Sequence, residues 1–300
     1  MLSFIYCCII DLPTNRTQTI DPYNPHADIL LRLEDIDDSQ LATLISFDEI
    51  VYAAEPGNRD EYASNPNIAL SNARRFTGFI ERIVKLSANI SNVHVTYAGG
   101  SWTRRKALPG LEVSDLAPAK TEEDGANPYE LAKTEAAKLA EYLSTKHSID
   151  ISFWDWISVV PNFAPNFTIS KMTKAAVESK IVTFSPGPYG RPLLHAQDAG
   201  RAVVMLAEDR LKNRSLNHHF ELILLPGHFT TFETFADAVV EIVKIEKGIE
   251  IAKISQMETP DWLKTTCLGS SRLRKVNFSP DETLIMEGLK ETCTKALSTL

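Results

Sequence analysis

A chain of 300 residues with 44% hydrophobic side chains is long enough to bury one large core, or a core with a smaller cap. Its formal net charge of −8, without a long basic run, argues against nucleic acid and anionic membranes as partners. The 4 cysteines show neither a Cys-x-x-Cys pair nor the spacing of a disulfide framework, so we expect reduced thiols in a soluble, cytoplasmic protein.

The first part of the chain predicts three strands and one helix. Met1–Ile10 is apolar but lacks a basic flank and is too short to span a membrane, so we interpret it as a candidate buried strand. Short apolar runs at Asp28–Leu33 and Glu49–Ala54 predict two more strands. Between them lies the acidic run Glu34–Asp38, followed by Ser39 as a candidate cap for a short helix.

The next segments predict a helix, a strand and a long loop. Apolar residues recur at helical spacing over Ile68–Leu86, and Val93–Tyr97 is a hydrophobic strand that continues into Ala98–Trp102. Arg104–Asn127 is polar and has little structure of its own. Loops of that length are usually functional or mobile.

The segment that begins at Pro128 predicts a helix with two candidate catalytic side chains on one face. Proline suits the first turn, and the run rich in Ala, Leu, Lys and Glu to Leu143 favours helix. Tyr129 and Lys133 lie four residues apart, so both project from the same face. An ammonium beside a phenol stabilises the phenolate, which would let Tyr129 exchange a proton with a substrate oxygen near neutral pH. On spacing alone, an amphipathic helix with a solvated lysine is the alternative.

The remaining elements follow in similar order. The expected strands and helices are the strand Ile149–Ile157, the helices Ser170–Lys180 and Asp198–Glu208, the strand Phe220–Leu225, and the helices Phe232–Ile245 and Asp281–Leu297. Thr230 and Glu233 have the spacing of a capping box at the start of the helix Phe232–Ile245.

The alternation of strands and helices from residue 28 to 160 predicts an α/β fold, a Rossmann-like doubly wound parallel sheet. The strands expected in one parallel sheet are Asp28–Leu33, Glu49–Ala53, Val93–Tyr97 and Ile151–Trp154. We expect a core over residues 1–165, with 193–225 returning to it, and a smaller C-terminal substrate-binding region over 166–192 and 226–300. In such sheets the chemistry gathers at the carboxyl ends of the strands.

Several segments resemble one known family, the extended short-chain dehydrogenases/reductases of the NAD-dependent epimerase/dehydratase group. Glu34-Asp35-Ile36-Asp37-Asp38 resembles the family's Gly-Asp-hydrophobic-x-Asp segment. Val51-Tyr52-Ala53-Ala54 resembles the strand that ends in His-x-Ala-Ala. Leu194-His195-Ala196-Gln197-Asp198 resembles the Phe-x-His-Val-x-Asp segment. Asn67 stands where the family often places an asparagine in its fourth helix, and Tyr129 with Lys133 matches the catalytic pair. The resemblance runs from about residue 28 to the C-terminus.

This resemblance implies an NAD or NADP cofactor and a small-molecule substrate. It assigns Tyr129 as general acid/base, Lys133 as its charged partner, and Ser101 as the hydroxyl that steadies the substrate oxygen. The implied cofactor-binding residues are Asp35, Ile36, Ala53, Ala54, Asn67, Lys133 and Val160.

Two departures from the family pattern bear on function. The family opens with a Gly-x-x-Gly-x-x-Gly turn that binds the pyrophosphate, whereas the first glycine here is Gly57. We expect either a truncated or misassigned N-terminus, or a fold that has lost its usual means of binding a dinucleotide. Aligning Trp102 with a family tryptophan places Gly99 on the catalytic serine, which leaves Ser101 as the nearest hydroxyl and an ordinary loop serine as the alternative.

Three functions therefore stay open. The first is an NAD(P)-dependent oxidoreductase or epimerase/dehydratase acting on a small metabolite, in secondary metabolism. The second is a cofactor-free isomerase, cyclase or dehydratase on the same fold, and the third is a non-catalytic reductase-like binding protein. No metal site is expected, because His218 and His219 have no acidic or thiol partner nearby. The expected partner is a small molecule, and a homodimer is the assembly we consider.

Overall fold

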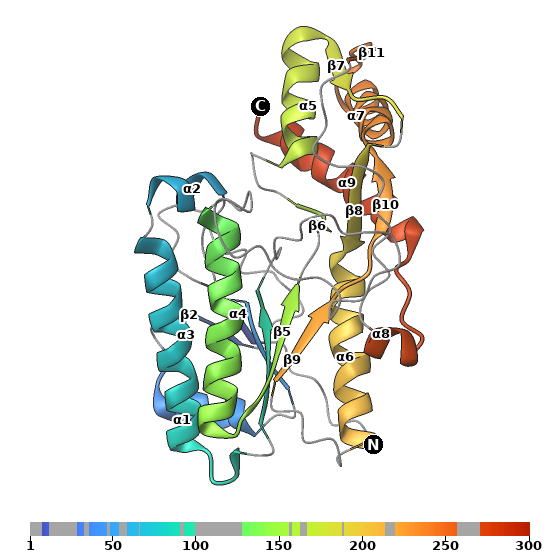
Figure 1. The fold of residues 1–300 in the computed structure, drawn as a ribbon. Coiled ribbons are helices and arrows are strands. Elements are labelled where there is room, and N and C mark those ends of the chain that lie inside the picture. Colours follow the sequence, from blue (N-terminus) through green and yellow to red (C-terminus); the bar gives the residue numbers. More distant parts are fainter. Residues whose placement is uncertain are drawn as a thin grey trace. The chain divides into compact units, whose positions relative to one another are not determined.

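The computed structural model describes residues 8–11, 29–32, 36–46, 49–53, 59–65, 67–90, 93–99, 128–155, 158–162, 167–187, 189–213, 220–256 and 271–300. The chain divides into two compact units (Figure 1). The first comprises Met1–Arg105, Ala117–Asp155 and Arg210–Ile223, and the second Lys106–Leu116, Trp156–Asp209 and Leu224–Leu300. The expected division into a core and a substrate-binding region stays a prediction.

The first unit contains the expected alternation of strands and helices. Its elements are β1 (Cys8–Asp11), β2 (Ile29–Arg32), α1 (Asp38–Ile45), β3 (Ile50–Tyr52), α2 (Arg59–Ser64), α3 (Asn67–Leu86), β4 (His94–Ala98), α4 (Pro128–His147), β5 (Asp150–Asp155) and, up to the boundary, β9 (Phe220–Leu224). The main sheet has the order β3-β4-β5-β9, and β4 pairs in parallel with both β3 and β5. The Rossmann-like parallel arrangement agrees with the predicted fold class.

One strand differs from the expected sheet. The structure pairs β2 in parallel with β1, Cys8 opposite Ile29, in a two-stranded sheet separate from the main one. The sequence pattern identifies an apolar strand but not its neighbour, because pairing is a long-range choice among similar apolar runs. The expected membership of Asp28–Leu33 in the main sheet is therefore corrected.

Aromatic rings fill the core of the first unit. The Tyr97 ring on β4 lies 4.3 Å from Phe76 of α3 and 5.0 Å from Phe153 of β5, between ring centroids. Tyr52 of β3 joins the same cluster, 5.0 Å from Phe76. All four rings are essentially inaccessible to solvent. Helices α3 and α4 lie side by side over this core (Figure 1).

Helix α4 buries a stripe of small and polar residues against the sheet. Its buried positions include Lys133, Ala137, Ala140 and Ser144, at the spacing of one helix face. The helix ends in a tight turn in which Ser148 has φ 54 and leads into β5. Since α4 runs opposite to β5, its first turn lies towards the carboxyl ends of the strands (Figure 1).

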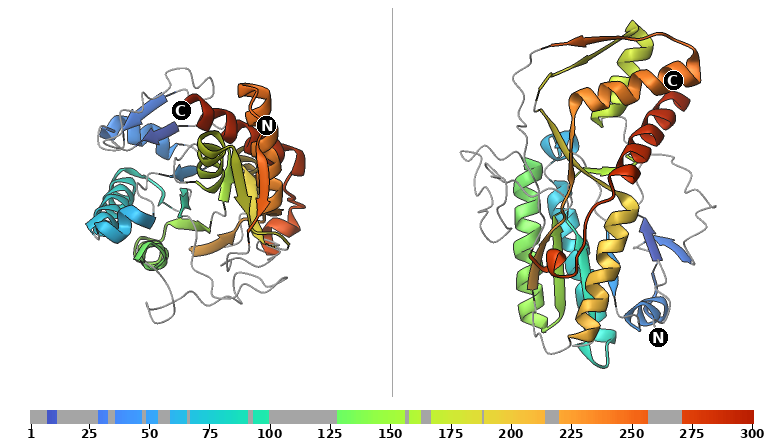
Figure 2. Two further views of the ribbon diagram at one scale, coloured as in Figure 1. Left: turned by 90° about the horizontal axis from the view of Figure 1, so that it is seen from above. Right: turned by 90° about the vertical axis from the view of Figure 1, so that its right-hand side faces the viewer.

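The described part of the second unit combines short strands with several helices. Its elements are β6 (Ser158–Val160), α5 (Thr168–Ser179), β7 (Ile181–Phe184), β8 (Gly190–His195), α6 (Ala196–Lys212, up to Asp209), β10 (His228–Thr231), α7 (Phe232–Lys247), β11 (Ala252–Ser255), α8 (Ser271–Lys275) and α9 (Glu282–Ser298). Strands β10, β8 and β6 form one sheet, and β11 pairs with β7. Helices α5, α7 and α9 pack against one another (Figure 2).

A buried thiol lies in this helical core. Cys293 of α9 is fully buried, and its burial raises the pKa of the thiol to about 11. The group is therefore a neutral thiol in the folded protein at neutral pH, as expected for a reduced structural cysteine.

Two helix caps differ from the sequence prediction by one or two residues. Asp37, rather than Ser39, caps α1, and the Ser39 hydroxyl donates to the Asp37 carboxylate at 2.7 Å. Thr231, rather than Thr230, caps α7 by accepting from the Thr234 N–H at 3.1 Å. Thr230 is buried in β10, because that strand continues up to the first turn of the helix.

Candidate active site

Tyr129 and Lys133 lie in the first two turns of α4 and contact each other. The Lys133 ammonium lies over the Tyr129 ring, with Nζ 5.3 Å from the ring centroid, within the range of roughly 6 Å for a cation–π contact. Lys133 is only 5% exposed, whereas Tyr129 is half-buried. The helix therefore holds an ammonium against a phenol ring that retains access to solvent.

The end of β4 has no side chain at the position aligned with the family's serine. Gly99 is buried, and a Cβ at this position would lie 1.9 Å from Cζ of Phe153. Any side chain at residue 99 would require the Phe153 ring to move, since real Cβ atoms do not approach another atom so closely. Ser101, the expected substitute hydroxyl, lies outside the described residues, and its role stays a prediction.

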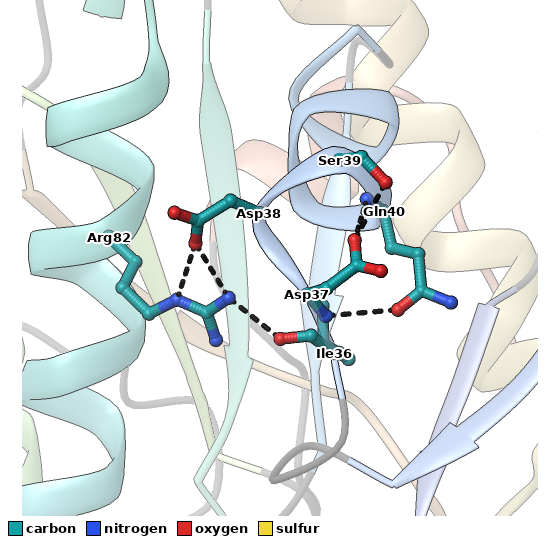
Figure 3. A network of polar contacts seen from close by, with 6 residues as sticks. All are labelled: Ile36, Asp37, Asp38, Ser39, Gln40 and Arg82. Atoms are coloured by element: carbon teal, nitrogen blue, oxygen red, sulfur yellow. Dashed lines mark hydrogen bonds and ion pairs between the residues drawn. The ribbon is translucent and has the colours of Figure 1, made fainter.

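The acidic segment before α1 ties that helix to α3 (Figure 3). The Asp37 carboxylate accepts from the Gln40 backbone N–H at 2.8 Å, and the Gln40 side chain accepts from the Asp37 N–H at 3.0 Å. Arg82 of α3 donates to the Ile36 carbonyl at 2.7 Å and pairs with Asp38 at 2.9 Å. The described part of this expected nucleotide-contacting segment thus has a clear structural role.

The other residues expected at a cofactor differ widely in exposure. Ala53 follows β3 and Asn67 begins α3, and both are exposed. Val160 is fully buried in the core of the second unit, so its side chain is not available to a ligand there. Asp35 and Ala54 lie outside the described residues. Cofactor contacts at these positions stay predictions.

A family model now decides the broad class of the chain. Residues 12–220, more than half of the sequence, match the NAD dependent epimerase/dehydratase family. The chain belongs to this family. The expected enzyme of the short-chain dehydrogenase/reductase type, with a nicotinamide cofactor, is therefore confirmed at the level of the family.

Solved structures support the same fold. A UDP-glucose 4-epimerase from Thermotoga maritima, determined with UDP-glucose, has a TM-score of 0.65 and 16% identity over 97% of this chain and 91% of that chain. RMD from Pseudomonas aeruginosa, complexed with NADPH, has a TM-score of 0.65 and 14% identity over 91% and 89%. A dTDP-glucose 4,6-dehydratase from Streptomyces venezuelae, with NAD bound, has a TM-score of 0.61 and 16% identity over 89% and 80%. No curated protein sequence matches significantly.

The residues of this family member fit a nicotinamide cofactor in part. Lys133 supplies a buried donor beside the expected acid/base residue, as the resemblance requires. The family's glycine-rich turn for the pyrophosphate has no counterpart in the 300-residue sequence, since no glycine precedes Gly57. A turn whose amides approach phosphate closely needs glycine at the contact positions. The 300-residue sequence therefore contains the pair that resembles the family's catalytic residues, and no glycine-rich turn precedes Gly57.

Two buried polar residues near Tyr129 were not predicted from the sequence. Tyr62 of α2 meets the Tyr129 ring edge to face, with centroids 5.2 Å apart and an interplanar angle of 90°. The Tyr62 hydroxyl accepts from Asn72 Nδ2 at 2.8 Å. The sequence feature that could have revealed this pair is Asn72, a polar residue on the apolar face of α3, four positions before Phe76.

A second polar cluster has the arrangement of a nucleophilic triad but not its accessibility. His94 Nδ1 lies 2.7 Å from Glu49 Oε1, and His94 Nε2 lies 2.9 Å from the Ser152 hydroxyl. Arg210 also pairs with Glu49. Ser152 is 1% exposed and His94 is the first residue of β4, at the amino ends of the strands. A substrate could not reach this hydroxyl, so we interpret the cluster as a structural network.

The segment matched to Phe-x-His-Val-x-Asp connects α6 to the start of α9. The Asp198 carboxylate accepts from the Asp281 N–H at 2.6 Å and pairs with Arg201 at 2.7 Å. His195 packs against Gly288 of α9, where a Cβ would lie 2.9 Å from the His195 ring. This motif therefore organises the second unit through contacts of its own side chains.

Within the described ranges, no group of three His, Cys, Asp or Glu residues is placed to hold a metal ion. No helix among the described elements has the length and apolar character needed to span a bilayer.

Proposed function

We propose that this chain is an NAD(P)-dependent oxidoreductase of the epimerase/dehydratase type, with Tyr129 as general acid/base and Lys133 as its charged partner. The supporting observation is the buried Lys133 ammonium, 5.3 Å from the centroid of the Tyr129 ring in the first turns of α4. Burying a charged group costs free energy, and the Tyr129 ring is one of the groups that contact this ammonium. Membership of the family gives the same pair its chemical context.

The proposed chemistry assigns one task to each side chain. Tyr129 takes a proton from a substrate hydroxyl, or returns one to a carbonyl oxygen, while the Lys133 charge stabilises its phenolate. When bound, a nicotinamide cofactor accepts and returns the hydride. Gly99 contributes no hydroxyl, so the substrate oxygen is steadied by Ser101 in this proposal.

A small polar metabolite is the proposed substrate, and nucleotide sugars are the first class to test. The structural neighbours include proteins determined with UDP-glucose and UDP-N-acetylmuramic acid. A panel of UDP- and dTDP-hexoses with NAD or NADP at millimolar concentration tests this proposal. Product formation measured by chromatography distinguishes epimerisation, dehydration and net oxidation.

The decisive variant is Tyr129→Phe, which removes only the hydroxyl. Turnover is expected to fall by roughly 10²–10⁴-fold if the phenol is the general acid/base. Stability should be almost unchanged, since the ring is retained. Tyr142→Phe is the matched control, because Tyr142 lies on the same helix and is 59% exposed. Equal rates for Tyr129→Phe and the unmodified chain would reject the proposal.

A cofactor-free isomerase, cyclase or dehydratase is the second candidate, favoured by the absence of any glycine before Gly57. Each lost charge-assisted bond to a pyrophosphate removes about 1.5–3 kcal/mol. Two or three such losses weaken binding by roughly 10²–10⁶-fold, since about 1.4 kcal/mol is tenfold. We therefore expect this chain to bind NAD(H) and NADP(H) with millimolar or weaker affinity.

Titration calorimetry of the purified 300-residue chain tests that expectation. A micromolar dissociation constant for either nucleotide would contradict it and identify a phosphate site other than a glycine-rich turn. Turnover in the complete absence of nucleotide, lost in Tyr129→Phe, would favour the cofactor-free candidate. Turnover that requires added nucleotide would favour the first.

A further inference from the structure

Tyr129 is contacted by a second aromatic ring as well as by Lys133. Tyr62 comes from α2, which packs against the start of α4, and its ring stands perpendicular to that of Tyr129 at 5.2 Å. The Lys133 ammonium contacts the same Tyr129 ring at 5.3 Å. These two contacts, one cationic and one aromatic, restrict the plane and direction of the Tyr129 ring.

The second neighbour is itself held in place. Tyr62 is 3% exposed although it belongs to a helix of only 6 residues. Its hydroxyl accepts a hydrogen bond from Asn72, which is 2% exposed and lies on the 20-residue helix α3. An apolar pair of the same shape would fill this space without burying polar atoms. A buried hydroxyl–amide bond instead specifies one geometry for the ring that carries it.

We propose that Tyr62, fixed by Asn72, is a positioning residue for Tyr129. This inference rests on the proposed function, in which the Tyr129 hydroxyl exchanges a proton with the substrate. Tyr62 does not act on the substrate in this account. It holds the Tyr129 ring so that the hydroxyl meets the reacting oxygen, and small misplacements of a reacting group have large effects on rate.

Kinetic variants separate the ring contact from the hydrogen bond. Tyr62→Leu removes the perpendicular ring and is expected to lower kcat by about 10–100-fold, with KM within about threefold. Tyr62→Phe retains the ring and removes the hydroxyl that accepts from Asn72, so its kcat should fall less than that of Tyr62→Leu. Tyr142→Leu, on the exposed face of α4, is the matched control and should leave kcat unchanged.

Fluorine NMR gives a readout that needs no substrate. All 8 tyrosines are replaced by fluorotyrosine, and the Tyr129 signal is identified as the one missing in Tyr129→Phe. The Tyr129 signal is expected to shift in Tyr62→Leu, because the perpendicular ring beside it is removed. In Tyr62→Phe and Asn72→Leu the same signal should broaden, because the ring beside it is less firmly held.

The outcomes distinguish this inference from the proposed function. A Tyr129 signal that neither shifts in Tyr62→Leu nor broadens in Tyr62→Phe overturns the inference, whatever the activity. Full activity of Tyr129→Phe overturns the proposed function and, with it, the positioning role. An inactive Tyr129→Phe beside a fully active Tyr62→Leu overturns only the inference. If Tyr62→Leu does not fold, Tyr62→Phe decides, and a Tyr129 signal that does not broaden in it overturns the inference.

Discussion

Lys133 keeps an ammonium at a position that is 5% exposed, against the ring of Tyr129. Lys133→Met preserves the length of the side chain and removes its charge. We expect slower turnover and a higher pH optimum, since the Tyr129 phenolate loses its stabilising neighbour. A pH–rate profile from pH 6 to 10 measures both effects.

The matched control for this variant is Lys138→Met on the same helix. Lys138 is exposed and pairs with Glu135 at 2.6 Å, so its loss should leave the profile unchanged. An optimum that stays in place in Lys133→Met would show that the charge is not coupled to the ionisation of the phenol.

Introducing the serine that the family alignment places at Gly99 should destabilise the protein. Placing a serine there would bring a Cβ to 1.9 Å from the Phe153 ring. Gly99→Ala and Gly99→Ser are therefore expected to destabilise the protein by about 1–3 kcal/mol through overpacking. Urea unfolding measures the change in free energy.

Gly78 provides the comparison, since nothing lies within 4 Å of a Cβ built there. Gly78→Ala lies inside α3 and should stabilise the protein by about 0.5–1 kcal/mol through helix propensity. Adding Phe153→Leu to Gly99→Ala should recover part of the loss, because the smaller side chain leaves room. Similar effects of alanine at residues 78 and 99 would contradict the clash.

At the scale of elements, one carboxylate joins α6 to α9. Asp198 is 2% exposed and accepts from the N–H of Asp281, the capping residue of α9. Asp198→Ala leaves that N–H without its acceptor and should cost about 1–3 kcal/mol. Asp198→Asn keeps an acceptor oxygen and should cost less. Equal destabilisation by both variants would mean that charge, and not the hydrogen bond, makes the connection.

At the scale of the whole molecule, acid stability depends on the buried Glu49. Burial by itself would raise the pKa of Glu49, but His94 and Arg210 outweigh it, so the pKa lies below its ordinary value. A carboxyl with a lowered pKa in the folded state stabilises the protein at pH above about 4.3, its ordinary value. That contribution is lost as the pH falls through the lowered folded value.

Glu49→Gln tests this contribution directly. Removing one partner of a buried ion pair costs about 3–5 kcal/mol at neutral pH. The difference from the unmodified chain should shrink as the pH is lowered from 7 to 3, measured by urea unfolding. Glu81→Gln is the control, because the Glu81–Lys146 pair is exposed and 3.8 Å long, and should change stability by less than about 0.5 kcal/mol.

Local signals in the sequence predicted much of the fold and one contact of the candidate site. Helix α3 follows from its helical periodicity, α4 from a long run of residues that favour helix, and the strands β3, β4 and β5 from short apolar runs. The Tyr129–Lys133 contact follows from a spacing of four within one helix. Short elements such as the 6-residue helix α2 have too few residues to show a period.

Long-range contacts could not be predicted in the same way. The Tyr62–Tyr129 contact joins residues 67 positions apart, and no local pattern links them. The approach of Gly99 to Phe153 depends on the register of β4 against β5, in which Ala98 lies opposite Trp154. The pairing of β2 with β1 is a choice among several apolar strands, which a single sequence does not rank.

Cys293 makes the opening rate of the second unit measurable. Its thiol is fully enclosed by α9 and its neighbours, and a pKa of about 11 leaves almost no thiolate at pH 8. A thiol reagent can modify it only after those helices separate, so the labelling rate reports how often they do. Mass spectrometry of the peptide that carries Cys293 isolates this signal from the other 3 cysteines. At high reagent concentration the rate should reach a plateau equal to the opening rate itself, and below that it should reflect the equilibrium between closed and open forms.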